Sequence, residues 1–92
     1  MSGLTHGMNV EAVRAAMKAI EGFRGELETL TGNIDAKIKE LPEIWKGTDS
    51  NQFVQLWDPE QKQNLMNCQT MLTGIVDSGN FQASQQEQTS AG

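Results

Sequence analysis

The chain has little cysteine, proline or aromatic content, and it has no tyrosine. Its single cysteine, Cys68, excludes an intramolecular disulfide, and no paired Cys/His spacing suggests zinc. No run of about eighteen apolar residues is present, so we expect no stable transmembrane insertion. The segment from Met1 to Asn9 also lacks the basic start and the apolar run of a Sec signal. These absences alone predict a cytoplasmic protein.

The chain is acidic, with a formal net charge of -5. Phosphate backbones would be repelled, so nucleic acid is not an expected partner. Catalysis would need convergent ionisable groups in a pocket. We instead interpret the charged residues as exposed helix positions that promote solubility, including Glu21, Glu28, Asp35 and Lys39. We therefore expect no enzyme activity, no catalytic residue, no metal and no cofactor.

Two apolar stripes predict a long first helix that begins at Val10, with Asn9 as its N-cap. Arg24 and Thr31 interrupt the first stripe, and we expect solvent beside them. Lys37 interrupts the second. The inner stripe comprises Val10, Val13, Met17, Ile20, Leu27, Ile34, Ile38, Leu41 and Trp45, and the outer stripe comprises Ala16, Phe23, Leu30 and Ile44. An apolar face this wide is typical of a helix with two neighbours. One neighbour is the second helix of this chain, and we expect the other to come from another chain.

The same segment contains residues that weaken helices, namely Gly22, Gly25, Gly32 and Pro42. The apolar spacing continues unshifted from Leu27 to Ile34, which favours one continuous helix. We expect a kink or a looser last turn at Pro42.

The tripeptide Trp45-Lys46-Gly47 predicts a bend between two helices. Glycine adopts positive φ without a Cβ clash, so Gly47 is a suitable helix terminator. Thr48, Asp49 and Ser50 are good N-cap residues, and Asp49 with Gln52 approximates a capping box. A second helix should therefore begin here with almost no loop, with the Trp45 indole covering the gap between the two helix ends.

The second helix has aromatic residues on one face, at Phe53 and Trp57, followed by Asp58-Pro59. Asp58 as an N-cap before Pro59 would give a short and a long helix joined at an angle. A single kinked helix is the alternative. Beyond this point an apolar face continues through Leu65, Cys68, Leu72 and Ile75, widened by Met66, Met71 and Val76. We interpret Cys68 as a small buried residue and not as a reactive thiol.

Gly79-Asn80 predicts the end of this helix, and the polar composition of 81–92 predicts a disordered tail. The expected organisation is a flexible leader (1–8), a helical hairpin (9–80) with its bend at 45–49, and the disordered tail (81–92).

The predicted fold is all-α: an antiparallel helix-turn-helix hairpin of two long helices that dimerises into a four-helix bundle. The predicted hairpin and dimer core is Val13, Met17, Ile20, Phe23, Leu27, Leu30, Ile34, Ile38, Leu41, Phe53, Trp57, Leu65, Cys68, Leu72 and Ile75.

The bend with its flanking helices resembles the WXG family of small type VII secretion substrates. Trp45, Gly47, Phe53 and Trp57 match the family pattern, and the resemblance covers roughly residues 9 to 80. It implies a secreted hairpin that is exported as a folded dimer, without a cleaved N-terminal signal, after recognition by the system's ATPase. It also implies that Trp45 and Gly47 form a recognition motif. A cytoplasmic coiled-coil adaptor or chaperone-like module is the alternative function.

The tail departs from the family pattern. The family's export signal is a tyrosine followed four residues later by an acid, just past the second helix. The nearest match here is a degenerate one, formed by Phe81, Gln85 and Glu87. We therefore expect the chain to travel with a second WXG-type chain that supplies the signal, which favours a heterodimer over a homodimer.

Overall fold

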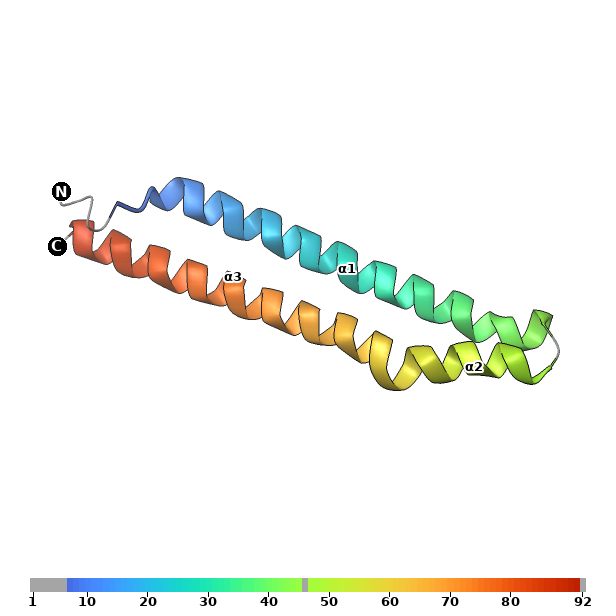
Figure 1. Ribbon diagram of the computed structural model, residues 1–92. Coiled ribbons are helices and arrows are strands. Elements are labelled where there is room, and N and C mark those ends of the chain that lie inside the picture. The colour runs from blue at the N-terminus through green and yellow to red at the C-terminus, as the bar shows by residue number, and fades with distance from the viewer. Residues whose placement is uncertain (1–6, 46, 92) are drawn as a thin grey trace. The chain divides into compact units, whose positions relative to one another are not determined.

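The computed structural model describes residues 7–45 and 47–91, and every regular element within them is helical (Figure 1). Most of the predicted leader lies outside the described residues, as do Lys46 and Gly92. The prediction of an all-α chain is confirmed. The elements are α1 (Val10–Ile44), α2 (Thr48–Leu56), the π-helical segment η1 (Trp57–Gln61) and α3 (Lys62–Ala91).

Helix α1 begins at the predicted cap. The Asn9 side-chain oxygen accepts a 3.0 Å hydrogen bond from the Ala12 amide, and this satisfies one of the free donors of the first turn. The helix continues without a break through Gly32 and through Pro42, and its last carbonyls include Leu41, which accepts from the Trp45 amide at 2.8 Å. The prediction of one continuous helix is therefore confirmed.

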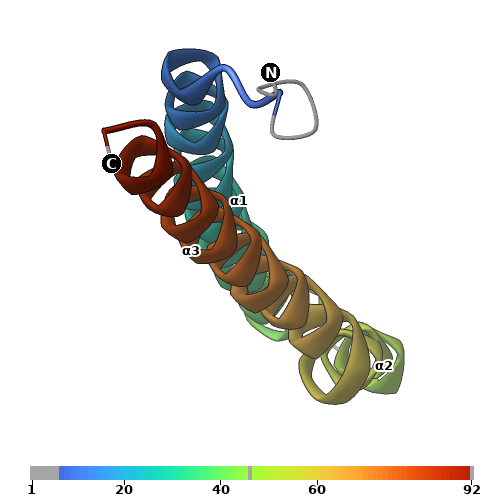
Figure 2. The same ribbon diagram turned by 90° about the vertical axis from the view of Figure 1, so that its left-hand side faces the viewer.

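The chain divides into two compact units. The first pairs the start of α1, up to Arg24, with α3 from Met71 onward; the second comprises Gly25–Thr70. Within each unit the partner's number falls as the number along α1 rises, so the helices run antiparallel. Contacts that show this are 14 with 84 and 17 with 79 in the first unit, and 31 with 69, 35 with 62 and 39 with 58 in the second. Figure 2 shows the start of α1 and the end of α3 side by side, as Figure 1 does.

The bend depends on the backbone conformation of Gly47 and not on a capping box. Gly47 has φ 135° and ψ 172°, a conformation that is almost exclusive to glycine, and it is the N-cap residue of α2 without any side-chain cap. The predicted capping box of Asp49 and Gln52 is therefore wrong. Ser50, which is 1% exposed, instead donates a 3.1 Å hydrogen bond to the Gly47 carbonyl. Because this bond fixes the first turn of α2, the helix begins directly after the glycine.

Pro59 is accommodated inside η1 and does not start a new helix. The Trp57 amide donates to the carbonyls of Phe53 and Val54, and the Lys62 amide donates to the Trp57 carbonyl. A π turn places one extra residue in the helix, which makes room for a proline that lacks an amide hydrogen. Of the two sequence alternatives, the broken helix with Asp58 as its cap is wrong, and the chain passes from α2 to α3 as one distorted helix (Figure 1).

Helix α3 continues to Ala91, well past the predicted stop at Gly79-Asn80. The prediction of a disordered tail after residue 80 is therefore wrong for residues 81–91. The physical reason lies in the packing. Gly79 contacts the Met17 side chain, and Ala83 is fully buried at 0% exposure. Tertiary contacts of this kind override a weak local stop signal.

Candidate partner interface and bend

The two stripes of α1 differ in burial. The members of the inner stripe that were predicted to be in the core are all partly buried, namely Val13, Met17, Ile20, Leu27, Ile34, Ile38 and Leu41. The large residues of the outer stripe are exposed, with Phe23 at 61%, Leu30 at 54% and Ile44 at 72%. Single exposed apolar residues are common on protein surfaces, but these three are spaced by multiples of seven residues and therefore share one face of α1, which Lys37 interrupts between Leu30 and Ile44.

The second helical arm shows the same division. Trp57 is buried at 7% exposure, and Leu65 and Leu72 are partly buried. Ile75 is 48% exposed. Cys68 is also exposed, so the prediction that it is buried is wrong for this chain. Cys68 is rotated by about 60° around α3 from the line that Leu65, Leu72 and Val76 form along the helix.

Thr31, one of the two polar residues that interrupt the inner stripe, makes a buried polar contact with the opposite arm. Thr31 is 4% exposed, so the expectation that solvent lies beside it is wrong. Its hydroxyl donates to the Leu27 carbonyl at 2.7 Å and accepts from the Gln69 amide at 3.1 Å. Because a buried hydroxyl that loses its partners costs about 1 to 3 kcal/mol, this pair favours the register that places residue 69 opposite residue 31.

Asp35 is the centre of a polar cluster that spans both arms of the second unit. Its carboxylate accepts a 2.9 Å hydrogen bond from the Trp57 indole, and Lys62 and Lys39 lie 3.2 Å and 3.3 Å from the same oxygen. Lys39 also pairs with Asp58 at 3.1 Å. The Trp57 hydrogen bond, followed by those from Lys62 and Lys39, lowers the pKa of Asp35 against the opposing effect of desolvation.

The sequence interpretation of Asp35 as a solubility residue missed this role. The spacing of Asp35 and Lys39, four residues apart in a helix, was the available local signal. The partners on the opposite arm are not visible from spacing alone. The indole of Trp57 is buried, and a buried indole N–H needs a hydrogen-bond acceptor. A tryptophan on the core face of the second helix was therefore a signal for a polar acceptor on the first helix.

The Trp45-Gly47 bend presents an aromatic pair. The Trp45 and Phe53 rings lie 5.5 Å apart between centroids and are tilted by 48°. Both side chains are nearly half exposed, at 43% and 45%. Trp45 contacts Phe53 of the second helix at the bend, but its rings are not buried between the helix ends as the sequence interpretation expected. The indole is both a packing residue and an accessible surface.

The tail residues face different directions. Phe81 is 61% exposed, while the Glu87 carboxylate lies 2.6 Å from the Arg14 guanidinium. Six residues of α-helix rotate a side chain by about 120° relative to the first, so Phe81 and Glu87 do not share a face of α3. Phe81 and the exposed Gln85 do share one, since they are four residues apart.

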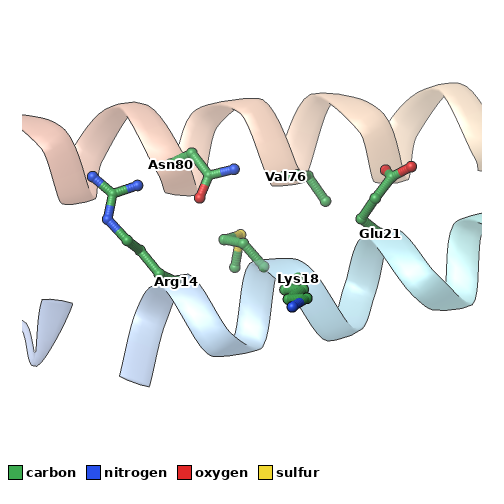
Figure 3. Close-up of a pocket in the computed structure, with 6 residues that line it drawn as sticks. Arg14, Lys18, Glu21, Val76 and Asn80 are labelled. Carbon is green, nitrogen blue, oxygen red and sulfur yellow. The ribbon is translucent and has the colours of Figure 1, made fainter. Parts of the chain in front are cut away.

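A hollow of about 450 Å³ lies between α1 and α3 in the first unit (Figure 3). In that view Arg14 and Glu21 extend from α1 toward α3, and Asn80 extends from α3 toward α1. Met17 and Val76 form the apolar part of the lining. Glu21 has its pKa lowered, mainly by its hydrogen bonds from Arg24.

Among residues 7–45 and 47–91, no three His, Cys, Asp or Glu side chains gather in a way that would hold a metal ion. None of the helices in this part of the chain is long and apolar enough to cross a bilayer.

The comparisons with known proteins agree with the bend and the helical arms. A family model described as WXG100, proteins of 100 residues with WXG, matches residues 7–89. No curated protein and no solved structure matches the chain. The model covers nearly all of the sequence, including both arms and the Trp45-Gly47 bend. The chain therefore belongs to the WXG100 family, and this membership implies a small helical substrate of type VII secretion.

Proposed function

We propose that this protein is exported as a folded dimer with a second WXG-type chain, after recognition by the ATPase of a type VII secretion system. The chain folds in the cytoplasm and leaves the cell without a cleaved N-terminal signal. The observation that carries the proposal is the exposed outer stripe of α1, because the described part of the chain leaves more than half of the surface of Phe23, Leu30 and Ile44 uncovered.

The outer stripe is the surface that we assign to the second chain. Full burial of one large apolar side chain contributes about 1.5 to 3 kcal/mol, so three of them favour association. Exposed apolar residues on the second arm, among them Met71 at 68% and Ile75 at 48%, add to the available surface. In a four-helix bundle each helix contacts two neighbours, which accounts for both stripes of α1.

Trp45 and Gly47 are the proposed recognition motif at the bend. The half-exposed indole leaves an aromatic face that a receptor can contact while the hairpin stays folded. The export signal itself comes from the partner, because this chain has no tyrosine and its nearest substitutes, Phe81 and Glu87, do not share a helix face. This favours a heterodimer.

The test is a charge placed in the outer stripe. Leu30→Glu should abolish dimerisation with the co-expressed partner, measured by sedimentation, and should leave the helicity of the hairpin unchanged. Ala36→Glu is the matched control, because Ala36 is exposed on the same helix, about 180° from Leu27. Secretion of Leu30→Glu should be lost and that of Ala36→Glu retained. A chain that is a stable monomer, or one that stays in the cytoplasm bound to a larger protein, would contradict the proposal and favour the adaptor function.

A further inference from the structure

The last turns of α3 pack against the start of α1. Gly79, Ala83 and Glu87 recur every four residues, so they lie on one face of the helix. A Cβ added at Gly79 would collide with the Met17 sulfur, and Ala83 is fully buried. The two helices therefore approach closely at Gly79, and the side chain of Ala83 one turn further on is small enough to be fully buried.

Arg14 extends this contact by one more turn. Its guanidinium donates to the Ser84 hydroxyl at 3.0 Å and to the Glu87 carboxylate at 2.6 Å. The Arg14 side chain is 39% exposed and that of Glu87 is 53% exposed. A pair this accessible to water is weak, so it can be exchanged for a competing cation without unfolding the hairpin.

We propose that Arg14 and the face of α3 formed by Gly79, Ala83 and Glu87 make a latch. When the latch is closed, the tail is part of the folded hairpin and the Glu87 carboxylate is paired with Arg14, so a cationic group of a receptor has to compete with Arg14 for it. The latch itself does not depend on the function of the protein. Its consequence, that an export receptor must read the partner's tail or first displace Arg14 from Glu87, rests on the proposed function.

The test is amide hydrogen exchange of residues 81–91, followed by mass spectrometry on the full-length chain. Arg14→Gln should raise the exchange rate of this segment by about two- to five-fold, the effect of losing one exposed ion pair. Lys18→Gln is the matched control, since Lys18 lies one turn along α1, lines the same hollow and has no ion pair among the described residues. It should leave the rate unchanged. An equal effect of both substitutions, or exchange of the unaltered tail at the rate of an unstructured peptide, would overturn the latch.

A charge reversal separates the ion pair from a general effect of charge. Arg14→Glu and Glu87→Arg should each raise the exchange rate of the tail, and the double variant should restore it to the original value. A double variant as open as either single one would overturn the proposed pairing.

Secretion, measured separately with the partner present, distinguishes the latch from the proposed function. An unprotected tail in a chain that is secreted normally would overturn the latch alone. A protected tail in a chain that is never secreted would overturn the proposed function and leave the latch standing.

Discussion

Within each of the two compact units of this chain, a different kind of contact joins the two helical arms. In the unit of Gly25–Thr70 the arms are joined by directional polar bonds, from Trp57 to Asp35 and from Gln69 to Thr31. In the other unit they are joined by the close approach of small residues, Gly79 and Ala83, and by the half-exposed ion pair of Arg14.

This difference has a consequence for stability and for register. Hydrogen bonds to buried groups are costly to leave unmade, so the Thr31 and Trp57 bonds specify which residues face one another. Small-residue packing and an exposed ion pair stabilise without that penalty. We therefore expect the Gly25–Thr70 unit to be the last to open and the end of α3 to open first.

The largest expected effect is the loss of Trp57. Trp57→Ala removes a 7% exposed indole and leaves Asp35 without its closest donor, and it should lower the free energy of unfolding by about 3 to 5 kcal/mol. Trp45→Ala, at the half-exposed bend, should lower it by only about 1 to 2 kcal/mol. Urea unfolding followed by circular dichroism measures both. Equal losses of stability for the two tryptophans would contradict the distinction between the buried Trp57, which is bonded to Asp35, and the accessible Trp45 at the bend.

A smaller effect is expected at the bend. Gly47→Ala forces a residue with a Cβ into φ 135°, and it should destabilise the hairpin by about 1 to 3 kcal/mol. Gly74→Ala is the control, because a Cβ at residue 74 of α3 meets nothing within 4 Å. That substitution should stabilise by up to about 1 kcal/mol through helix propensity. Thermal unfolding of both variants tests the assignment, and a neutral Gly47→Ala would show that the bend tolerates another conformation.

Much of the fold could be predicted from spacing. The apolar periodicity predicted α1 as one helix, the Asn9 side chain predicted its start, and Gly47 predicted the bend. These features are local, since each depends on residues within one or two turns. The stop at Gly79-Asn80 was also argued locally and was wrong, because the contacts of Gly79 and Ala83 with the opposite arm stabilise the helix beyond it.

The polar contacts between the arms could not be predicted in the same way. Asp35 meets Trp57 and Lys62 across the hairpin, and which residue of the second arm lies opposite depends on the length of the bend and on the extra residue of η1. The burial of Thr31 could not be predicted for the same reason. A hydroxyl at a core position is expected to face solvent unless its hydrogen-bond partner, here Gln69, is known.

The smallest expected effect is the acid sensitivity of the Asp35 cluster, because its ion pairs are partly exposed and screened by water. The pKa of Asp35 is lowered from 3.8, chiefly by the Trp57 hydrogen bond and then by Lys62 and Lys39. A carboxyl with a depressed folded-state pKa contributes stability that is fully present above the unfolded value and is lost as the pH falls through the folded value. The contribution of Asp35 should therefore begin to fall at about pH 4 and be lost once the pH is below its lowered folded-state pKa.

The measurement is the urea stability of the unaltered chain and of Asp35→Asn between pH 7 and pH 2. At neutral pH Asp35→Asn should be the less stable, because a neutral amide replaces the carboxylate that faces two lysines. The difference between the two chains should shrink as the pH falls through the lowered pKa of Asp35, because the protonated carboxyl is also neutral. Asp77→Asn is the control, since Asp77 is exposed on α3 and has no ion pair in the part of the chain that the structure describes. It should follow the unaltered chain throughout. A difference for Asp35→Asn that persists unchanged at pH 2 would mean that Asp35 stabilises the second unit through packing and not through its charge.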